Sequence, residues 1–286
     1  MKWFLMILLS YVMSCSAIEN NKYWNIRYDE KGIPLVDVVF LNEKHTLMLD
    51  TGSSSGLHLE LDSFNKLKNN DVNNINDEKV HHFIDVTGME QKVSSIKISQ
   101  LEISNIYFRD FEVVNLKPWG LAIGGELPNS EVIGLGMFKN QIVMMDFEKN
   151  RIEILHSLPR NIDAWSLYSV NKTKSGLVIS TMIEKKSLRF VIDTAASHSI
   201  LFEGKLPDRV KLLGCNTFSP DFLYTDCKVV EFYMKNRKGE IIKSPAMIVP
   251  SATSDEIDFD GLLGMSYLNN KVIIMDLSKG DLYVKN

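Results

Sequence analysis

The segment LMLDTGSS at residues 47–54 organises the interpretation of the whole chain, because a similar segment, FVIDTAAS, returns at residues 190–197. Two more segments match in the same order. PLVDVVFLNEK (residues 34–44) resembles GLVISTMIEKK (residues 176–186), and VIGLGMFKNQIVMMDFEKNRIEI (residues 132–154) resembles GLLGMSYLNNKVIIMDLSKGDLYV (residues 261–284). Three matches in one order predict an internal repeat. We expect two similar lobes, residues 18–160 and 161–286.

Short apolar and β-branched runs, separated by turn residues, predict an all-β fold. Helix signals are few, and the best helix candidate covers residues 61–68. The connection between the lobes is predicted at residues 159–174. The expected strands cover residues 35–41, 46–49, 93–98, 142–145, 152–155, 189–192, 229–234 and 272–275.

Composition excludes several classes of protein. Hydrophobic residues make up 45% and charged residues 24% of the 286 residues, which is typical of a globular protein and not of disorder, collagen or a long coiled coil. The formal net charge is −4, without a clustered basic face, so we expect no nucleic acid partner. We also expect no metal and no organic cofactor. A single apolar run, at the N-terminus, argues against a polytopic membrane protein.

The N-terminus has the layout of a secretory signal over residues 1–17. An apolar run at residues 4–13 is followed by small residues at 14–17. Residues 12–15 (VMSC) resemble a bacterial lipobox, in which Cys15 is lipidated, whereas residues 15–17 (CSA) fit an ordinary signal-peptidase site. We favour the lipobox because Cys15 otherwise has no role. A buried N-terminal helix is the remaining alternative. The expected location is the periplasm or outer membrane of a bacterium, with secretion as the alternative.

Export would place the two remaining cysteines, Cys215 and Cys227, in an oxidising compartment. A disulfide between them would close a short loop and stabilise the fold by about 3 kcal/mol. Two buried free thiols are the alternative.

The repeated aspartates, Asp50 and Asp193, suggest a shared chemistry. Each ends an apolar run, so each carboxylate must leave the core at a turn. Taken singly, each fits an Asx-type turn. Two pseudo-symmetric lobes, however, can bring the carboxyl groups together. Such a pair shares one proton, so one member can activate a water molecule while the other donates to a carbonyl oxygen.

These motifs resemble those of the aspartic peptidases, in the two-lobed retropepsin-like or pepsin-like arrangement of bacterial members. The resemblance covers roughly residues 33–284. The family's hydrophobic-hydrophobic-Gly element is matched by residues 261–265 (GLLGM) and more loosely by residues 132–136 (VIGLG). It implies two pseudo-symmetric, six-stranded closed β-barrel lobes of the acid protease fold. It also implies an aspartic endopeptidase that acts as a monomer on a peptide or protein substrate and contacts a membrane only through the lipid anchor.

The resemblance assigns roles to residues of both motifs. Asp50 and Asp193 would be the catalytic dyad, and Thr51 and Thr194 would bond across the lobe interface. Supporting positions beside the carboxylates are Gly52, Ser53, Ala195 and Ala196. Thr87, Gly88 and Met89 would form the tip of a flap that covers a substrate bound as an added strand.

Two residues depart from the family pattern. Ala195 replaces a glycine, and its methyl group would be unfavourable if that position needs a positive φ or a close approach of substrate. Ala196 lacks the hydroxyl that Ser53 offers to a carboxylate, and its absence should raise the pKa of the dyad. We therefore expect a pH optimum nearer neutral than acidic. A catalytically weak or inactive peptide-binding envelope protein is the main alternative.

Other patterns give weaker hypotheses. Residues 52–56 (GSSSG) fit the nucleophile elbow of serine hydrolases around Ser54, but that motif needs a strand-to-helix turn. His81 and His82 could bind a metal, but neighbours on a strand point to opposite faces, and we expect exposed loop histidines. His198 is expected to have a structural role.

Overall fold

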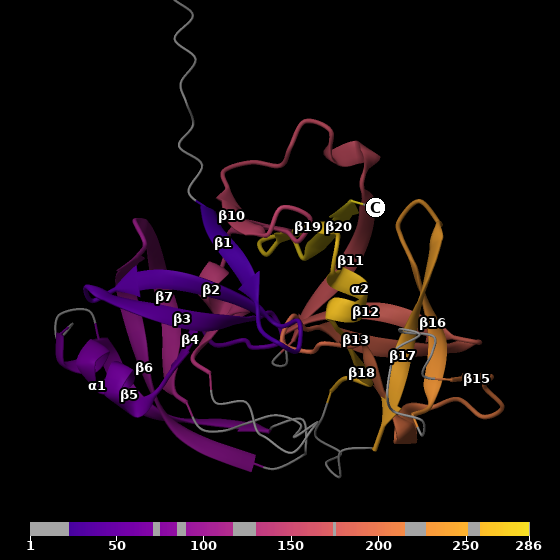
Figure 1. Ribbon diagram of the computed structural model, residues 1–286, viewed down its shortest axis with the longest axis horizontal. Coiled ribbons are helices and arrows are strands. Elements are labelled where there is room, and N and C mark those ends of the chain that lie inside the picture. Colours follow the sequence, from indigo (N-terminus) through magenta and orange to yellow (C-terminus); the bar gives the residue numbers. More distant parts are fainter. Residues whose placement is uncertain are drawn as a thin grey trace, which may run out of the picture.

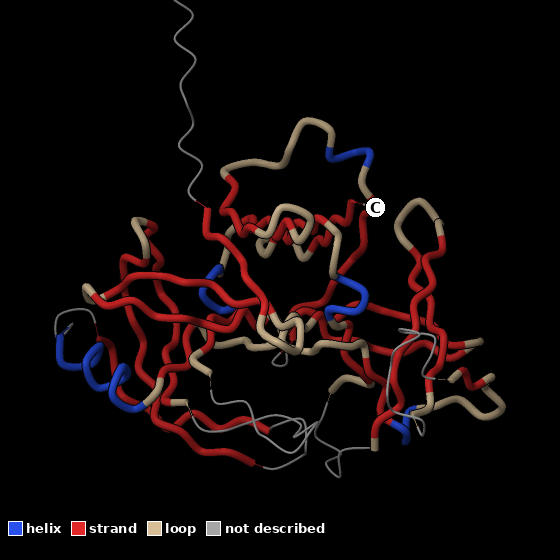
Figure 2. Tube along the Cα trace, in the orientation of Figure 1, coloured by secondary structure: helices blue, strands red, loops and turns tan. Residues whose placement is uncertain are grey.

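Strands dominate the computed structural model (Figures 1 and 2), which describes residues 23–70, 75–84, 90–116, 130–173, 176–214, 227–250 and 258–285. The first half of the chain contains β1 (Tyr23–Tyr28), β2 (Pro34–Phe40), β3 (Glu43–Asp50), β4 (Leu57–Leu59), α1 (Leu61–Asn70), β5 (Ile75–Ile84), β6 (Glu90–Ile103), β7 (Ile106–Asn115), β8 (Val132–Gly134), the 3-10 helix η1 (Leu135–Phe138), β9 (Ile142–Asp146) and β10 (Arg151–Leu155).

The second half follows nearly the same order of strands. It contains the 3-10 helix η2 (Ile162–Ala164), β11 (Ser166–Thr173), β12 (Gly176–Ile183), β13 (Lys186–Ile192), β14 (Ile200–Phe202), the 3-10 helix η3 (Glu203–Lys205), β15 (Leu212–Leu213), β16 (Val229–Lys235), β17 (Ile241–Val249), β18 (Gly261–Leu263), α2 (Met265–Leu268), β19 (Val272–Asp276) and β20 (Asp281–Lys285).

Local sequence explains these strands. In β2, side chains at Val36, Val38 and Phe40 are buried and alternate with exposed ones, because successive residues of a strand face opposite sides of the sheet. The turn to β3 places Asn42 in the left-handed region at φ 63°, a conformation that asparagine adopts more readily than most residues. In α1, Phe64 and Leu67 are buried on one face, as the predicted helix requires.

Each half forms a six-stranded barrel. In lobe two, β12, β13, β18, β14, β17 and β16 pair in this order, and β16 pairs again with β12 to close the barrel. In lobe one, β2, β3, β8, β4, β7 and β6 pair in the corresponding order. This barrel closes between β6 and β2, where the N–H of Ser104, directly after β6, donates to the Val39 carbonyl of β2 at 2.8 Å. The predicted all-β fold of two pseudo-symmetric barrels is confirmed.

A third sheet joins the two barrels, and the sequence did not predict it. It is antiparallel and contains β1, β10, β9, β19, β20 and β11 in this order. Its centre is the pairing of β9 with β19, in which Met144 lies opposite Ile274. In Figure 1, β10, β19 and β20 lie above and between the two lobes.

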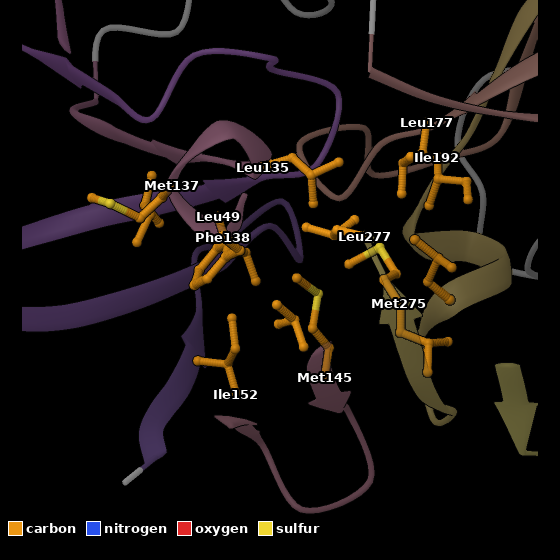
Figure 3. Packing of buried hydrophobic residues seen from close by; sticks show 14 of the residues in the cluster. Leu49, Leu135, Met137, Phe138, Met145, Ile152, Leu177, Ile192, Met275 and Leu277 are labelled. Carbon is orange, nitrogen blue, oxygen red and sulfur yellow. The ribbon is translucent and has the colours of Figure 1, made fainter. Parts of the chain in front are cut away.

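The main hydrophobic core runs from one lobe into the other. Figure 3 shows Leu49 and Met145 of lobe one packed toward Ile192, Met275 and Leu277 of lobe two. Leu49 and Ile192 directly precede the two aspartates of the repeat. The core therefore supports the ends of β3 and β13 from below and fixes them relative to each other.

The prediction that residues 159–174 connect the lobes is right up to residue 165 and wrong beyond it. Only residues 156–165, with η2, connect the lobes, because β11 already begins at Ser166. Tyr168 and Val170 alternate with more exposed residues and bury their side chains in the core. The strand was missed although its buried residues alternate with polar ones, which is the pattern of a half-buried strand.

Within the described ranges, no helix is both long enough and apolar enough to cross a lipid bilayer. The predicted signal, residues 1–17 with Cys15, lies outside the described residues. Export and lipidation therefore stay predictions.

We predict that Met275→Ala lowers the free energy of unfolding by about 2 to 5 kcal/mol, because the Met275 side chain is fully buried in the core that both lobes share. Val80→Ala on β5, where the side chain is 63% exposed, is the control and should change stability by less than about 1 kcal/mol. Urea denaturation measures both. Equal effects would contradict the shared core.

Candidate active site

The two aspartates of the repeat meet at the junction of the lobes. Asp50 ends β3 and Asp193 directly follows β13, and each of these strands runs parallel to a short partner, β8 or β18. Asp50 is 4% exposed, whereas Asp193 is partly exposed. The two carboxyl groups lie side by side, since a Cβ on Gly52 would be close to both of them. The structure therefore brings together the two predicted catalytic residues.

Thr51 and Thr194 bond across the junction beneath the aspartates. The Thr51 N–H donates to Thr194 Oγ1 at 3.1 Å, and the Thr194 N–H donates to Thr51 Oγ1 at 3.1 Å. Thr51 Oγ1 donates to the Ile192 carbonyl at 2.7 Å, and Thr194 Oγ1 donates to the Leu49 carbonyl at 2.6 Å. Both threonines are fully buried, so four reciprocal bonds hold the two aspartate turns in register.

Backbone N–H groups orient each carboxylate. The N–H groups of Gly52 and Ser53 donate to Asp50 Oδ1 at 2.8 and 3.1 Å. The Ala195 N–H donates to Asp193 Oδ1 at 2.8 Å. These bonds keep the carboxyl groups at the mouth of their turns, where an Asx-type turn alone would also place them. The pairing across the junction is what distinguishes this site from two isolated turns.

Gly52 is required by close approach. A Cβ at this position would lie 3.0 Å from Asp193 Cγ and 3.1 Å from Asp50 Oδ1. A methyl group there would press on both carboxyl groups. Gly52 also faces the start of β12, because a Cβ on Gly176 would lie 3.1 Å from the Gly52 carbonyl oxygen. A turn of lobe two thus packs on the aspartate turn of lobe one.

Ala195 is accommodated without backbone strain. It does not adopt a positive φ, so the conformational concern raised by the missing glycine is unfounded. Its side chain packs against the lobe-one cluster of Ile33, Met48 and Val132. Ile33 lies in the turn before β2, so a turn of lobe one also packs on the aspartate turn of lobe two.

The expected contact between the Ser53 hydroxyl and Asp50 is not formed. Ser53 Oγ lies 2.6 Å from His58 Nε2 instead, so Ser53 donates to Asp50 only through its backbone N–H. In lobe two, the Ala196 side chain packs against an apolar cluster that includes Val178 and Ile200. Neither described carboxyl group therefore accepts a hydroxyl hydrogen bond at this position.

Burial raises the pKa of both carboxyl groups. For Asp50, burial and the nearby charge of Asp193 raise the pKa well above its usual range. For Asp193, burial raises the pKa to about 6, while hydrogen bonds from the Ala195 N–H and from Asp50 act in the opposite direction. The two groups titrate as a pair, so the loss of the first proton, near neutral pH, leaves one proton shared between Asp50 and Asp193.

Sequence reasoning missed a group of polar residues in lobe one. His58 on β4 contacts Ser53, and the His81 ring on β5 lies 3.2 Å from a carboxylate oxygen of Glu112 on β7. Ser55 Oγ also donates to Glu112, at 3.3 Å. A histidine between two leucines of β4 was the available signal, since His58 faces away from Leu57 and Leu59.

The structure also places the residues of the weaker sequence hypotheses. His81 and His82 lie on β5, not in a loop, and within the described ranges no group of three metal-binding side chains occurs. Ser54 lies in a strand-to-strand connection between β3 and β4, so the nucleophile elbow is excluded. The His198 ring lies 3.1 Å from Ser197 Oγ, and burial lowers its pKa, in agreement with a structural role.

Two predictions fall partly outside the described residues. Strands β5 and β6 pair as far as Ile84 and Glu90, and the flap residues Thr87, Gly88 and Met89 between them are not described. Cys227 is disulfide-bonded, and its predicted partner Cys215 lies outside the described residues. The flap and the disulfide pairing therefore stay predictions.

Comparison with known proteins shows the fold and no more. No protein-family model and no curated protein matches the sequence. Among solved structures, the chain is similar to basic 7S globulin from soybean, with a TM-score of 0.54 and 9% sequence identity. The match covers 92% of this chain and 94% of the globulin chain. The two-lobed architecture is therefore shared across nearly the full length of both proteins.

We predict that Thr194→Val lowers the free energy of unfolding by about 1 to 3 kcal/mol, because it leaves the Thr51 N–H and the Leu49 carbonyl unsatisfied in a buried site. Thr181→Val is the matched control. Thr181 is equally buried, but its hydroxyl makes only a 3.4 Å contact with the Leu188 carbonyl. Thermal or urea unfolding of both variants measures the difference, which should favour the control by at least about 1 kcal/mol.

We also predict that folding stability falls as the pH rises from about 4 to about 7. Carboxyl groups with a raised folded pKa favour the native state while protonated, and this contribution is lost as the pH rises through the folded pKa, about 6 for Asp193. Asp193→Asn should remove much of this decrease, and Asp37→Asn, at an exposed ion pair with Arg27, should not. Urea unfolding at several pH values measures it. A slope unchanged by Asp193→Asn would contradict the assignment.

Proposed function

We propose that the protein is an aspartic endopeptidase in which Asp50 and Asp193 form the catalytic dyad. The single observation that carries the proposal is the pair of adjacent carboxyl groups, Asp50 buried and Asp193 partly exposed, at the junction of two pseudo-symmetric lobes. Such a pair can hold one proton and one negative charge side by side, which is the state needed for general acid and general base catalysis together.

The proposed reaction starts from protonated Asp50 and ionised Asp193. Asp193 takes a proton from a water molecule, whose oxygen bonds to the carbonyl carbon of the substrate while Asp50 donates its proton to the carbonyl oxygen. The resulting diol then returns one hydroxyl proton to Asp50. Asp193 gives its proton to the leaving nitrogen, and the carbon–nitrogen bond breaks. Both carboxyl groups regain their starting states, and no covalent intermediate forms.

The backbone around the dyad suits this reaction. The N–H groups of Gly52, Ser53 and Ala195 orient both carboxyl groups before substrate arrives, which lowers the reorganisation needed during the reaction. Gly52 leaves the space directly beside the carboxyl groups free of side chains. We further propose an extended peptide as substrate, a monomeric enzyme without cofactor, and an exported or lipid-anchored location.

A peptide-binding protein without catalytic activity is the second candidate. The similar soybean protein is named a globulin and not a peptidase, and one fold commonly serves several functions. Ala195 adds a methyl group at the partly exposed floor of the site, at the position where Gly52 has none. In this candidate the same site would bind a peptide and leave its bonds intact.

We predict that the protein cleaves an unfolded protein substrate and that Asp50→Asn and Asp193→Asn each reduce the rate at least about 100-fold. The control Asp37→Asn changes an exposed carboxylate that is paired with Arg27 and should leave the rate unchanged. Cleavage should increase through about pH 6, because the ionised form of Asp193 appears there. The measurement is the rate of fragment formation between pH 3 and pH 8.

Different results would select the alternative. Maximal cleavage below about pH 4, where an isolated aspartate is half protonated, would contradict the raised pKa values. Absence of cleavage by every folded form would favour the peptide-binding protein. Ala195→Gly should then be tested first, since recovery of cleavage would identify the methyl group as the cause.

A further inference from the structure

We propose that His58 is a positioning residue of the dyad: its Nε2 accepts the hydroxyl hydrogen of Ser53 and so keeps that hydroxyl from donating to Asp50. The inference rests on the proposed function only in naming the pair a dyad. It concerns a hydrogen bond and a titration that exist whether or not the protein cleaves peptides.

The short distance favours the hydroxyl as the donor. The distance between Ser53 Oγ and His58 Nε2 is 2.6 Å, which is short for an N–H donor but close to the usual range for an O–H donor. A serine hydroxyl has only one hydrogen to donate. When this hydrogen lies on His58, Asp50 must be satisfied by other donors, and it receives the backbone N–H groups of Gly52 and Ser53.

The Ser53 hydroxyl lies close enough to Asp50 for the choice of partner to matter. A Cβ on Gly134 would lie 2.8 Å from Ser53 Oγ, and Gly134 pairs directly with Asp50 in the parallel ladder of β3 and β8. The Ser53 N–H already reaches Asp50 Oδ1 at 3.1 Å. Because Ser53 Oγ is only three bonds from this nitrogen, the hydroxyl is within reach of the same carboxyl group when it does not bond His58.

The second lobe shows what occupies the same place without these polar groups. His58 lies opposite Val132 of β8, which also lies opposite Met48. In the same way, Ile200 lies opposite Leu262 of β18, which also lies opposite Val191. Met48 and Val191 each precede their aspartate by two residues, so Ile200 is the counterpart of His58. Ala196 is the counterpart of Ser53 and packs in the same cluster as Ile200. A serine and histidine in lobe one thus correspond to an alanine and isoleucine in lobe two.

The surroundings keep His58 a neutral acceptor. Burial and the nearby His81 on β5 lower its pKa to about 4, against the opposing charge of Glu112 on β7. The Glu112 carboxylate is hydrogen-bonded to His81 and to Ser55 and not to His58. Neutral imidazole accepts a hydrogen bond at one ring nitrogen, so His58 can bind the Ser53 hydroxyl throughout the range in which the dyad titrates.

The predicted consequence is a higher pKa for the dyad. A hydroxyl that donates to a carboxylate favours the ionised form and lowers its pKa, so its diversion to His58 has the opposite effect. His58→Ile introduces the lobe-two residue and frees the Ser53 hydroxyl. We expect the sum of the two apparent pKa values of the Asp50 and Asp193 pair to fall by about one unit.

The experiment is an NMR titration of the side-chain carboxyl carbons of Asp50 and Asp193 between pH 3 and pH 9, which reads the dyad without any cleavage assay. His58→Ile should lower the sum, whereas Ser53→Ala and the double variant should match the wild type, because neither has a hydroxyl to redirect. His58→Gln supplies an oxygen acceptor and should also match the wild type. In the wild type, the NMR chemical shifts of the His58 ring nitrogens should show that Nε2 carries no hydrogen.

Two results would overturn the proposal. The first is a protonated Nε2 in the wild type at pH 7, which makes His58 the donor and needs no variant to fold. The second is a decrease of equal size in His58→Ile and in the double variant, which would assign the change to the lost imidazole and not to the Ser53 hydroxyl. Loss of cleavage in every form would leave both measurements interpretable and would bear on the proposed function alone.

Discussion

The reciprocal hydrogen bonds of Thr51 and Thr194 are the interaction on which the rest of the site depends. Each hydroxyl accepts an N–H from the other lobe and donates to a carbonyl one residue before the other lobe's aspartate. Because both threonines are buried, no water can replace these bonds without opening the core. They hold two carboxyl groups in contact although burial and mutual repulsion oppose their ionisation. Burial raises the pKa of both carboxyl groups, and for Asp50 the enforced proximity of Asp193 raises it further.

The two lobes share one backbone plan but differ in the chemistry beside the dyad. Lobe one surrounds its aspartate turn with Ser53, His58 and, further out, Glu112, whereas lobe two uses Ala196 and an apolar cluster. The symmetric backbone places the carboxyl groups together, and the asymmetric side chains make them unequal. An unequal pair is what acid–base chemistry needs, since one member must keep the proton while the other loses it.

The sequence predicted the two repeated barrels but not the sheet that joins them. The duplicated aspartate motif predicted the two barrels and the meeting of Asp50 with Asp193, because an internal repeat reports pseudo-symmetry directly. The sheet that joins the lobes was not predicted, because the edge of β9 carries no sequence signal for its partner β19. The Ser53 and His58 contact was missed because it depends on side-chain direction between a loop and a strand. Likewise, Ala195 looked unfavourable only while its φ and its neighbours were unknown.

The central pairing of β9 with β19 has a consequence for how the chain is made. β9 belongs to the first half of the chain, yet its partner strand follows every strand of the lobe-two barrel in the sequence. During synthesis, the edge of β9 therefore stays unpaired until β19 has been made. Unpaired apolar strand edges can pair with other chains. Asp146 and Asp276, which end β9 and β19, place carboxylates at opposite ends of this edge. A chain that ended between the lobes would keep this edge of β9 without its partner β19.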